Sequence, residues 1–245
     1  MSEQFRVGFA AGVTPDKWAR AWADRMPRRP LALEPLGERD GVAMLHSGEL
    51  QMCFVRLPVD TAGLHLIPLY DEQPVVVVSR ENPVAAYEEI DVADLADEHL
   101  LQDPDDVPAW RALATEVREG TRHPVPPMTL AQAVETVAAG TGVLVLPLSL
   151  ARLHHRKDVT HVPVTGVASS SVGLAWPVTH GEDIDDRVDT FIGVVRGRTA
   201  NTSRDARAVS QTDAPARKTA PGRARRTPTK RTGSQPARAR RKPGR

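Results

Sequence analysis

The chain has 245 residues, of which 40% are hydrophobic, so it can bury the core of one large or two small domains. Its net charge of +1 hides a division: residues 1–200 carry 18 basic and 29 acidic side chains (net −11), whereas residues 201–245 carry 14 and 2 (net +12). The single cysteine excludes an internal disulfide and a multi-thiolate metal site, and no apolar run reaches the roughly 18 residues of a membrane span. With no signal-peptide pattern at the N-terminus, we expect a cytoplasmic protein.

The first third of the chain alternates apolar strands with amphipathic helices. The patterns predict strands at 5–9, 31–36, 50–55 and within 64–79, and helices at 15–26 and up to His46. Thr14 is a predicted N-cap, with Pro15 at the first helical position. The loop before it lies between the end of a strand and the start of a helix, where backbone N–H groups can face a polar or anionic ligand. Four valines after Pro74 predict a strand that is buried on both faces.

The rest of the acidic part repeats this alternation. It predicts strands at 99–101, 143–146, 159–164 and 172–176, and helices at 91–95, 105–120, 130–139, 149–154 and 184–195. Strands that alternate with helices are typical of an α/β protein with mostly parallel sheets.

The segment from Pro124 to Pro147 is the most informative part of the chain. Thr129 and Gln132 have the spacing of a capping box, so they mark the start of a helix that ends at Gly140. The apolar run at 143–146 then predicts a central strand of a covered parallel sheet. Most of this segment is typical of a core, but Thr129 stands at a helix N-terminus beside a strand end, where such folds bind ligands.

Taken together, residues 5–197 resemble the effector-binding (substrate-binding) domain of LysR-type transcriptional regulators. Five segments carry the resemblance: FRVGF at 5–9, GELQMCF at 48–54, GLHLIPL at 63–69 followed by VVVV at 75–78 and NPV at 82–84, AAGTGVLVLP at 138–147, and LAW at 174–176. The fourth is similar to the family's Ala-Ala-Gly-x-Gly-(apolar)-Pro segment and is the most specific of them. Gln51 departs from the pattern, because the family usually has Asp there.

The resemblance implies an α/β type II periplasmic-binding-protein fold, in which two Rossmann-like subdomains are joined by two crossover strands. It implies subdomain I at 1–78 and 168–198 and subdomain II at 79–167. The composition of residues 199–245, which is rich in Ala, Arg, Pro, Thr and Ser, predicts a disordered basic tail. The sequence begins close to the first strand, so the family's N-terminal winged helix-turn-helix is not expected before it.

By the geometry of this family, a small-molecule cleft lies between the subdomains. The residues expected to line it are Ala11, Gly12, Val13, Thr14, Arg39, Arg56, Gln102, Asp103, Met128, Thr129 and Pro147. An arginine matches a carboxylate or phosphate with two parallel hydrogen bonds, so either Arg39 or Arg56 could anchor an anionic effector.

Other reactive residue types have simpler explanations. The histidines at 154, 155 and 161 lack companions at metal-ligand spacing, so we expect no metal site and no cofactor. Cys53 has apolar neighbours typical of a buried thiol. Aspartates at 103–106 and 183–186 precede helices, where capping and the helix dipole explain them. The sequence therefore predicts no catalytic residues and no enzyme.

The tail has no hydrophobic periodicity, and its cations can bind polyanions through counterion release. The candidate DNA-binding residues are Arg223, Arg225, Arg226, Lys230, Arg231, Arg238, Arg240, Arg241, Lys242 and Arg245. Two Pro-Gly-Arg sequences resemble minor-groove AT-hook cores. Folding back onto the acidic part, or a purely solubilising role, remain alternatives.

These observations favour a non-enzymatic, transcription-related effector-binding protein whose tail contacts DNA. Its expected partners are a small neutral or anionic effector, nucleic acid through the tail, and a second copy or a related regulator, with no membrane. The first alternative is a ligand-binding or dimerisation module without DNA binding. The second is an enzyme on the same two-lobed fold.

Overall fold

The structure is a computed structural model that describes residues 4–37, 40–178 and 185–197. Arg39, the predicted tail and its DNA-binding residues lie outside the described residues. Among the described residues, no helix is long and apolar enough to cross a membrane.

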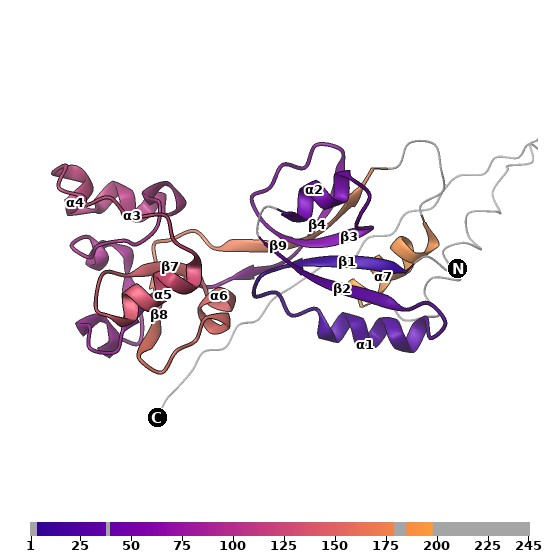
Figure 1. The fold of residues 1–245 in the computed structure, drawn as a ribbon, viewed down its shortest axis with the longest axis horizontal. Helices are drawn as coiled ribbons and strands as arrows, with labels where there is room; N and C mark the ends of the chain where they lie inside the picture. The colour runs from indigo at the N-terminus through magenta and orange to yellow at the C-terminus, as the bar shows by residue number, and fades with distance from the viewer. Residues whose placement is uncertain (1–3, 38–39, 179–184, 198–245) are drawn as a thin grey trace, which may run out of the picture. The chain divides into compact units, whose positions relative to one another are not determined.

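Two sheets organise the described residues (Figure 1). The first lobe contains the strands β1 (Phe5–Ala10), β2 (Leu31–Leu36), β3 (Met52–Arg56), β4 (Leu64–Glu72) and β9 (Ser170–Pro177), with the helices α1 (Asp16–Arg25), α2 (Asp40–His46) and α7 (Asp186–Val195). The second lobe contains β5 (Pro74–Ser79), β6 (Ile90–Asp91), β7 (Leu144–Pro147) and β8 (Val159–Thr165), with α3 (Pro108–Leu113), α4 (Thr115–Arg118), α5 (Leu130–Ala138) and α6 (Leu148–Leu153). Short 3-10 helices cover Pro83–Ala86, Val92–Leu95 and Pro104–Asp106.

The strand directions correct one expectation. The first sheet has the order β2-β1-β3-β9-β4, and β9 runs antiparallel to both of its neighbours. The second has the order β6-β8-β5-β7, and β5 runs antiparallel to β8 and β7. The prediction of mostly parallel sheets was therefore wrong. β7 runs antiparallel to β5, although a parallel bridge joins Val143, just before β7, to Leu100 in the strand predicted at 99–101. Both faces of β5 are covered by other parts of the second lobe, so its continuous apolar run reflects this burial even though its neighbours are antiparallel.

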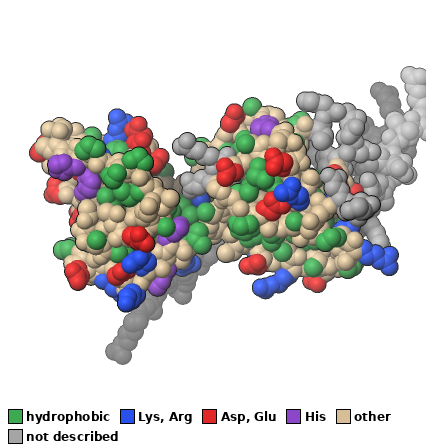
Figure 2. Space-filling model, in the orientation of Figure 1, with side chains coloured by type: hydrophobic (Ala, Val, Ile, Leu, Met, Phe, Trp, Pro, Cys, Tyr) green, Lys and Arg blue, Asp and Glu red, His purple; other side chains and the backbone are tan. Residues whose placement is uncertain are grey.

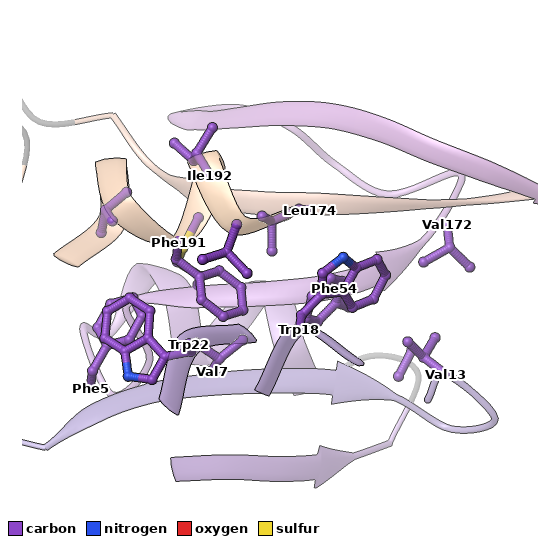
Figure 3. Packing of buried hydrophobic residues seen from close by; sticks show 14 residues of the cluster. Phe5, Val7, Val13, Trp18, Trp22, Phe54, Val172, Leu174, Phe191 and Ile192 are labelled. Carbon is purple, nitrogen blue, oxygen red and sulfur yellow. The ribbon is translucent and has the colours of Figure 1, made fainter. Parts of the chain in front are cut away.

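Aromatic side chains form the core of the first lobe (Figure 3). Trp22 of α1 stacks on Phe5 with ring centroids 4.9 Å apart, and Trp18 stacks on Phe54 at 4.6 Å. Phe191 of α7 packs edge-on against Phe5 and Phe54. The predicted helical spacing of the two tryptophans thus fixes α1 on the sheet, because offset and edge-on ring pairs are the favoured arrangements.

The valines of β5 confirm the predicted strand with two buried faces. Val76 and Val78 pack in one cluster with Trp110 of α3, whereas Val75 and Val77 pack in another with residues of α5. All four have exposed fractions of 3% or less. The strand therefore forms the centre of the second lobe's core.

Two helix starts differ in their capping. Thr129 accepts a hydrogen bond from the backbone N–H of Gln132, whose side chain accepts one from the backbone N–H of Thr129, so the predicted capping box is present. Thr14 does not cap α1, since the N-cap position is Pro15, which makes no side-chain hydrogen bond.

The helix predicted at 105–120 is shorter and divided, because Ala114 has an extended ψ of 124° between α3 and α4.

The chain passes between the lobes through two connections. Gln73 alone separates β4 from β5, and residues 166–169 separate β8 from β9. At the lobe boundary Glu72 and Ser170 are directly paired across β4 and β9. The subdomain boundaries predicted at residues 78–79 and 167–168 stay a prediction.

Candidate ligand-binding cavities

A cavity of about 1110 Å³ is lined by residues from both lobes. Six residues of the predicted cleft line it, namely Ala11, Arg56, Gln102, Asp103, Met128 and Pro147. Gly12, Val13 and Thr14 instead line a second cavity of about 1010 Å³. Thr129 lines neither, although Met128 and Leu130 on either side of it line the first.

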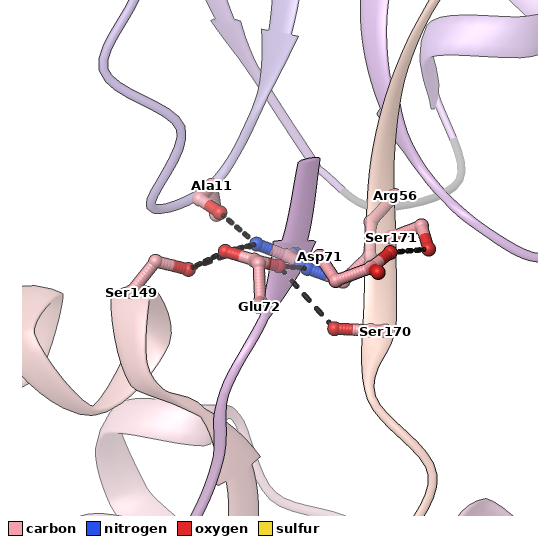
Figure 4. Close-up of polar contacts among 7 residues, drawn as sticks. All are labelled: Ala11, Arg56, Asp71, Glu72, Ser149, Ser170 and Ser171. Atoms are coloured by element: carbon pink, nitrogen blue, oxygen red, sulfur yellow. Dashed lines mark hydrogen bonds and ion pairs between the residues drawn. The ribbon is translucent and has the colours of Figure 1, made fainter. Parts of the chain in front are cut away.

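Arg56 forms a buried polar network with residues of both lobes (Figure 4). Its Nε lies 2.6 Å from Oε2 of Glu72, and the two side chains are 10% and 4% exposed. Its Nη2 donates to the carbonyl oxygen of Ala11 at 2.9 Å and to Oγ of Ser149 at 3.2 Å. Ser149 and Ser170 both donate to Glu72. This network, which we call the Arg56–Glu72 network, connects the loop after β1, the last residue of β4 and the first residue of β9 to α6.

The pairing with Glu72 weakens the attraction of Arg56 for an anionic ligand in the first cavity. A guanidinium whose charge is matched by a buried carboxylate attracts an added anion weakly, and separating the pair would leave a buried charge uncompensated. The geometry therefore favours a role for Arg56 in positioning the lobes over the predicted role as an anion anchor.

A second arginine lines the first cavity and had no sequence signal. Arg122 pairs with Glu116, and its Nη2 donates to the carbonyl oxygens of Leu100 at 2.7 Å and Gln102 at 2.9 Å. Oε2 of Glu116 lies 2.6 Å from Nδ1 of His99. Both arginines of the first cavity thus have a carboxylate partner.

Two polar residues that line the first cavity, Gln102 and Asp103, form hydrogen bonds with the backbone. Oε1 of Gln102 accepts a hydrogen bond from the backbone N–H of Val145 at 2.9 Å. The carboxylate of Asp103 accepts one from the N–H of Asp105 at 3.0 Å, which caps a 3-10 helix. A capping role is therefore confirmed for Asp103 and this 3-10 helix, whereas α3 has Val107 at its N-cap and no side-chain cap, so the expectation that Asp105 or Asp106 caps that helix was wrong.

Reactive groups outside the cavities give no further site. Cys53 is 1% exposed, and burial raises the pKa of its thiol to about 12, so it packs as a small apolar residue. Burial, followed by the neighbouring charge of Arg152, lowers the pKa of His161. Within the described ranges, no three His, Cys, Asp or Glu side chains are grouped to hold a metal ion.

On the face drawn in Figure 2, acidic, basic and hydrophobic side chains are interspersed. This view shows no single charged patch that would outweigh the cavities as a candidate site.

Comparison with known proteins identifies the family. Residues 2–200 match the LysR substrate binding domain. The chain belongs to this family. Its two lobes accordingly have the effector-binding fold of LysR-type regulators, which is like that of type II periplasmic binding proteins.

Two curated relatives of this LysR-family chain are each called "Probable hydrogen peroxide-inducible genes activator". The protein from Mycobacterium avium is 32% identical over 152 residues, which are 59% of this chain and 49% of that protein. The protein from Mycobacterium leprae is 33% identical over 116 residues, covering 44% and 36%. The chain spans about half or less of the length of these relatives.

Solved structures agree on the fold. The oxidized form of OxyR superposes with a TM-score of 0.62 at 23% identity, covering 81% of this chain and 96% of that one. The effector-binding domain of BenM with benzoate gives 0.59 at 17% identity, covering 86% and 96%. A full-length OxyR variant from Pseudomonas aeruginosa gives 0.60 at 24% identity, covering 80% of this chain and 70% of that one.

Proposed function

We propose that this chain is the small-molecule-sensing module of a transcriptional regulator and that its effector occupies the first cavity. The observation that carries the proposal is a cavity of about 1110 Å³ lined by both lobes, which is large enough for a small organic ligand. A ligand that contacts both lobes can bind one arrangement of them more tightly than another, and this differential affinity is what a sensor requires.

The walls of the first cavity suggest the chemistry of the effector. They are mainly apolar, with Leu101, Val125, Met128, Leu144 and Leu146 among the lining residues. The lining arginines and aspartates are equal in number, and each arginine has a carboxylate partner. We therefore propose a ligand with an apolar or aromatic body, for which net charge matters less than shape. The benzoate bound to BenM is a suitable first probe of this class.

A cavity-filling variant tests this proposal. Ala168 is exposed and lines the first cavity, so Ala168→Trp should place an indole in the ligand's volume without overpacking the core. Ala62→Trp is the matched control, because Ala62 is exposed in another loop and lines neither cavity. Aromatic acids and their neutral amides would be screened by thermal shift, in which a ligand at a hundred times its Kd stabilises by about 2.7 kcal/mol.

The proposal predicts that hits stabilise the unchanged chain and Ala62→Trp but not Ala168→Trp. Equal stabilisation of all three proteins would place the ligand elsewhere and refute the assignment of the first cavity.

We propose that this module does not sense peroxide through its own thiol, although both curated relatives carry peroxide-inducible names. A thiol sensor needs an accessible thiolate, and the chain's single cysteine is buried with a raised pKa. A small-molecule effector is more consistent with these residues.

The proposal of DNA contact through the tail rests on its 14 basic residues and two acidic ones. A gel shift at rising salt would compare the full chain with residues 1–200, and equal affinity for DNA would refute the role of the tail.

Cytoplasmic location and pairing with a second copy or a related regulator are also proposals. Sedimentation that shows a strict monomer at tens of micromolar would contradict self-pairing.

Binding without catalysis fits the polar groups of the cavity better than an enzyme does. Among the described residues, the Ser149 hydroxyl contacts Glu72 and Arg56, which already pair with each other. A nucleophile would need a base held by a third group and an electrophilic site facing the substrate.

A further inference from the structure

The second cavity differs from the first in the side chains that line it. It has a volume of about 1010 Å³ and lies against the loop after β1, the start of α1, the end of β2 and the helix α6. Its ionisable lining residues are Asp16, Lys17, Arg20, Glu72, Arg152 and Tyr70. No part of the function proposed above uses this cavity.

Three cations of the second cavity have no carboxylate partner among the residues that the structure describes. Lys17 lies over the ring of Trp18, with Nζ 4.3 Å from the ring centroid, and Arg20 and Arg152 form no ion pair there. Of the two lining acids, Glu72 is paired with Arg56, which leaves Asp16 to offset three positive charges. The lining thus has an excess of two cations, although residues 1–200 have a net charge of −11.

Tyr70 adds a neutral hydrogen-bond donor. Its side chain lines the second cavity, and its hydroxyl makes no hydrogen bond to the described residues. Burial, followed by the charge of Glu72, raises the pKa of this hydroxyl, so it stays protonated near neutral pH and can donate to an anion.

Apolar side chains complete the lining. Phe9, Val13, Trp18 and Leu36 come from the first lobe, and Leu153, which is 55% exposed, comes from α6. A ligand that suits this lining has an apolar body and carries negative charge that Arg20, Arg152 and the hydroxyl of Tyr70 can bind.

We propose that the second cavity is a separate binding site for a small organic dicarboxylate with an apolar body. Two carboxylates match the excess of two cations, and the planar guanidinium groups favour paired oxygens. The site is distinct from the first cavity, where the arginines are already matched by Glu72 and Glu116.

The test uses the full chain and two probes of the same shape. Phthalate carries two carboxylates on an aromatic ring, and phthalamide is its neutral diamide. Calorimetry or NMR titration would measure both against the unchanged chain, Arg20→Gln, Arg152→Gln and the double variant. Arg118→Gln is the control, because Arg118 is an exposed arginine of α4 that lines neither cavity.

We expect phthalate to bind and phthalamide to bind at least about tenfold more weakly, since charge-assisted hydrogen bonds are about twice as strong as neutral ones. Each cavity variant should weaken phthalate by about tenfold, and Arg118→Gln should leave it unchanged. The Ala168→Trp variant should retain phthalate binding, which separates this site from the first cavity.

Three outcomes would overturn the proposal. They are equal binding of the two probes, unchanged phthalate affinity in the double variant, and no phthalate binding at millimolar concentration. Circular dichroism melts that overlay for all variants would show that lost binding does not reflect lost folding.

Discussion

The two cavities share the residue Ala11 and both border the Arg56–Glu72 network, yet they differ in charge. In the first, Arg56 and Arg122 each have a buried or half-buried glutamate partner. In the second, Lys17, Arg20 and Arg152 have no carboxylate partner among the described residues. An arginine beside a cavity therefore indicates an anion site only when the rest of the structure leaves its charge unmatched.

The network between the cavities should give the largest effect. Glu72→Ala leaves the guanidinium of Arg56 buried without its carboxylate, so we expect the free energy of unfolding to fall by about 3–5 kcal/mol, measured by urea denaturation. Replacing Arg56 and Glu72 together by methionine should cost less, because no uncompensated charge remains.

Glu34→Gln is the control for this prediction. Glu34 pairs with Arg6 through a 2.5 Å contact between Nε and Oε1, but both side chains are partly exposed, at 37% for Arg6 and 27% for Glu34. Its loss should be much smaller. Similar losses for Glu72→Ala and Glu34→Gln would show that burial does not increase the cost of removing the carboxylate of Glu72.

Thr129 at the edge of the first cavity should give a smaller effect. Thr129→Ala removes the capping box of α5, so we expect a loss of about 1 kcal/mol in the free energy of unfolding. Affinity for a first-cavity ligand should be unchanged, because Thr129 does not line that cavity. Thr129→Ser keeps the capping hydroxyl and is the control. A large loss of affinity with intact stability would restore the ligand contact that the sequence suggested.

Tyr70 provides a titration for the second cavity. Its raised pKa means that the folded state holds the proton longer than the unfolded state. Its contribution to stability is therefore complete below the ordinary value of 10.0 and is lost as the pH rises through the raised pKa. Tyrosinate absorbance of the chain minus that of Tyr70→Phe would show this late titration.

Phthalate in the second cavity should raise the pKa of Tyr70 further, because an added anion disfavours the phenolate. A Tyr70 titration that phthalate leaves unchanged, although phthalate binds, would place the ligand away from this hydroxyl.

Peroxide should give the smallest effect. Since Cys53 is buried with a pKa of about 12, brief treatment of the folded chain should leave this thiol unoxidised, as measured by its alkylation in denaturant afterwards. Oxidation in denaturant provides the positive control. Rapid oxidation of Cys53 in the folded chain, with altered ligand binding, would support a response like that in the names of the curated relatives.

Local patterns predicted much of the fold. The three-residue spacing of Thr129 and Gln132 located the start of α5, and four consecutive valines located the centre of the second lobe. The division of the helix near Ala114 could not be predicted, because alanine favours helix continuation. Strand direction could not be predicted from local patterns either, since it depends on how the chain crosses between the lobes.

The sites were less predictable because charge pairing is long-range. Arg56 was identified as a cavity residue, but Glu72 is 16 positions away and Ser149 is 93 positions away. No spacing rule links them, so the sequence could not show that this arginine is neutralised. For the same reason it could not bring Arg152 of α6 to the same cavity as Arg20 of α1.

The direct pairing of Glu72 with Ser170 has a further consequence for how the chain could be rebuilt. Because these residues are neighbours, everything from 73 to 169 enters and leaves through one point, as an insertion into a β-hairpin. A short turn of the Asn-Gly type could replace it and connect β4 directly to β9. The first lobe could then be made as a small protein of its own, and a different second lobe could be grafted at the same junction.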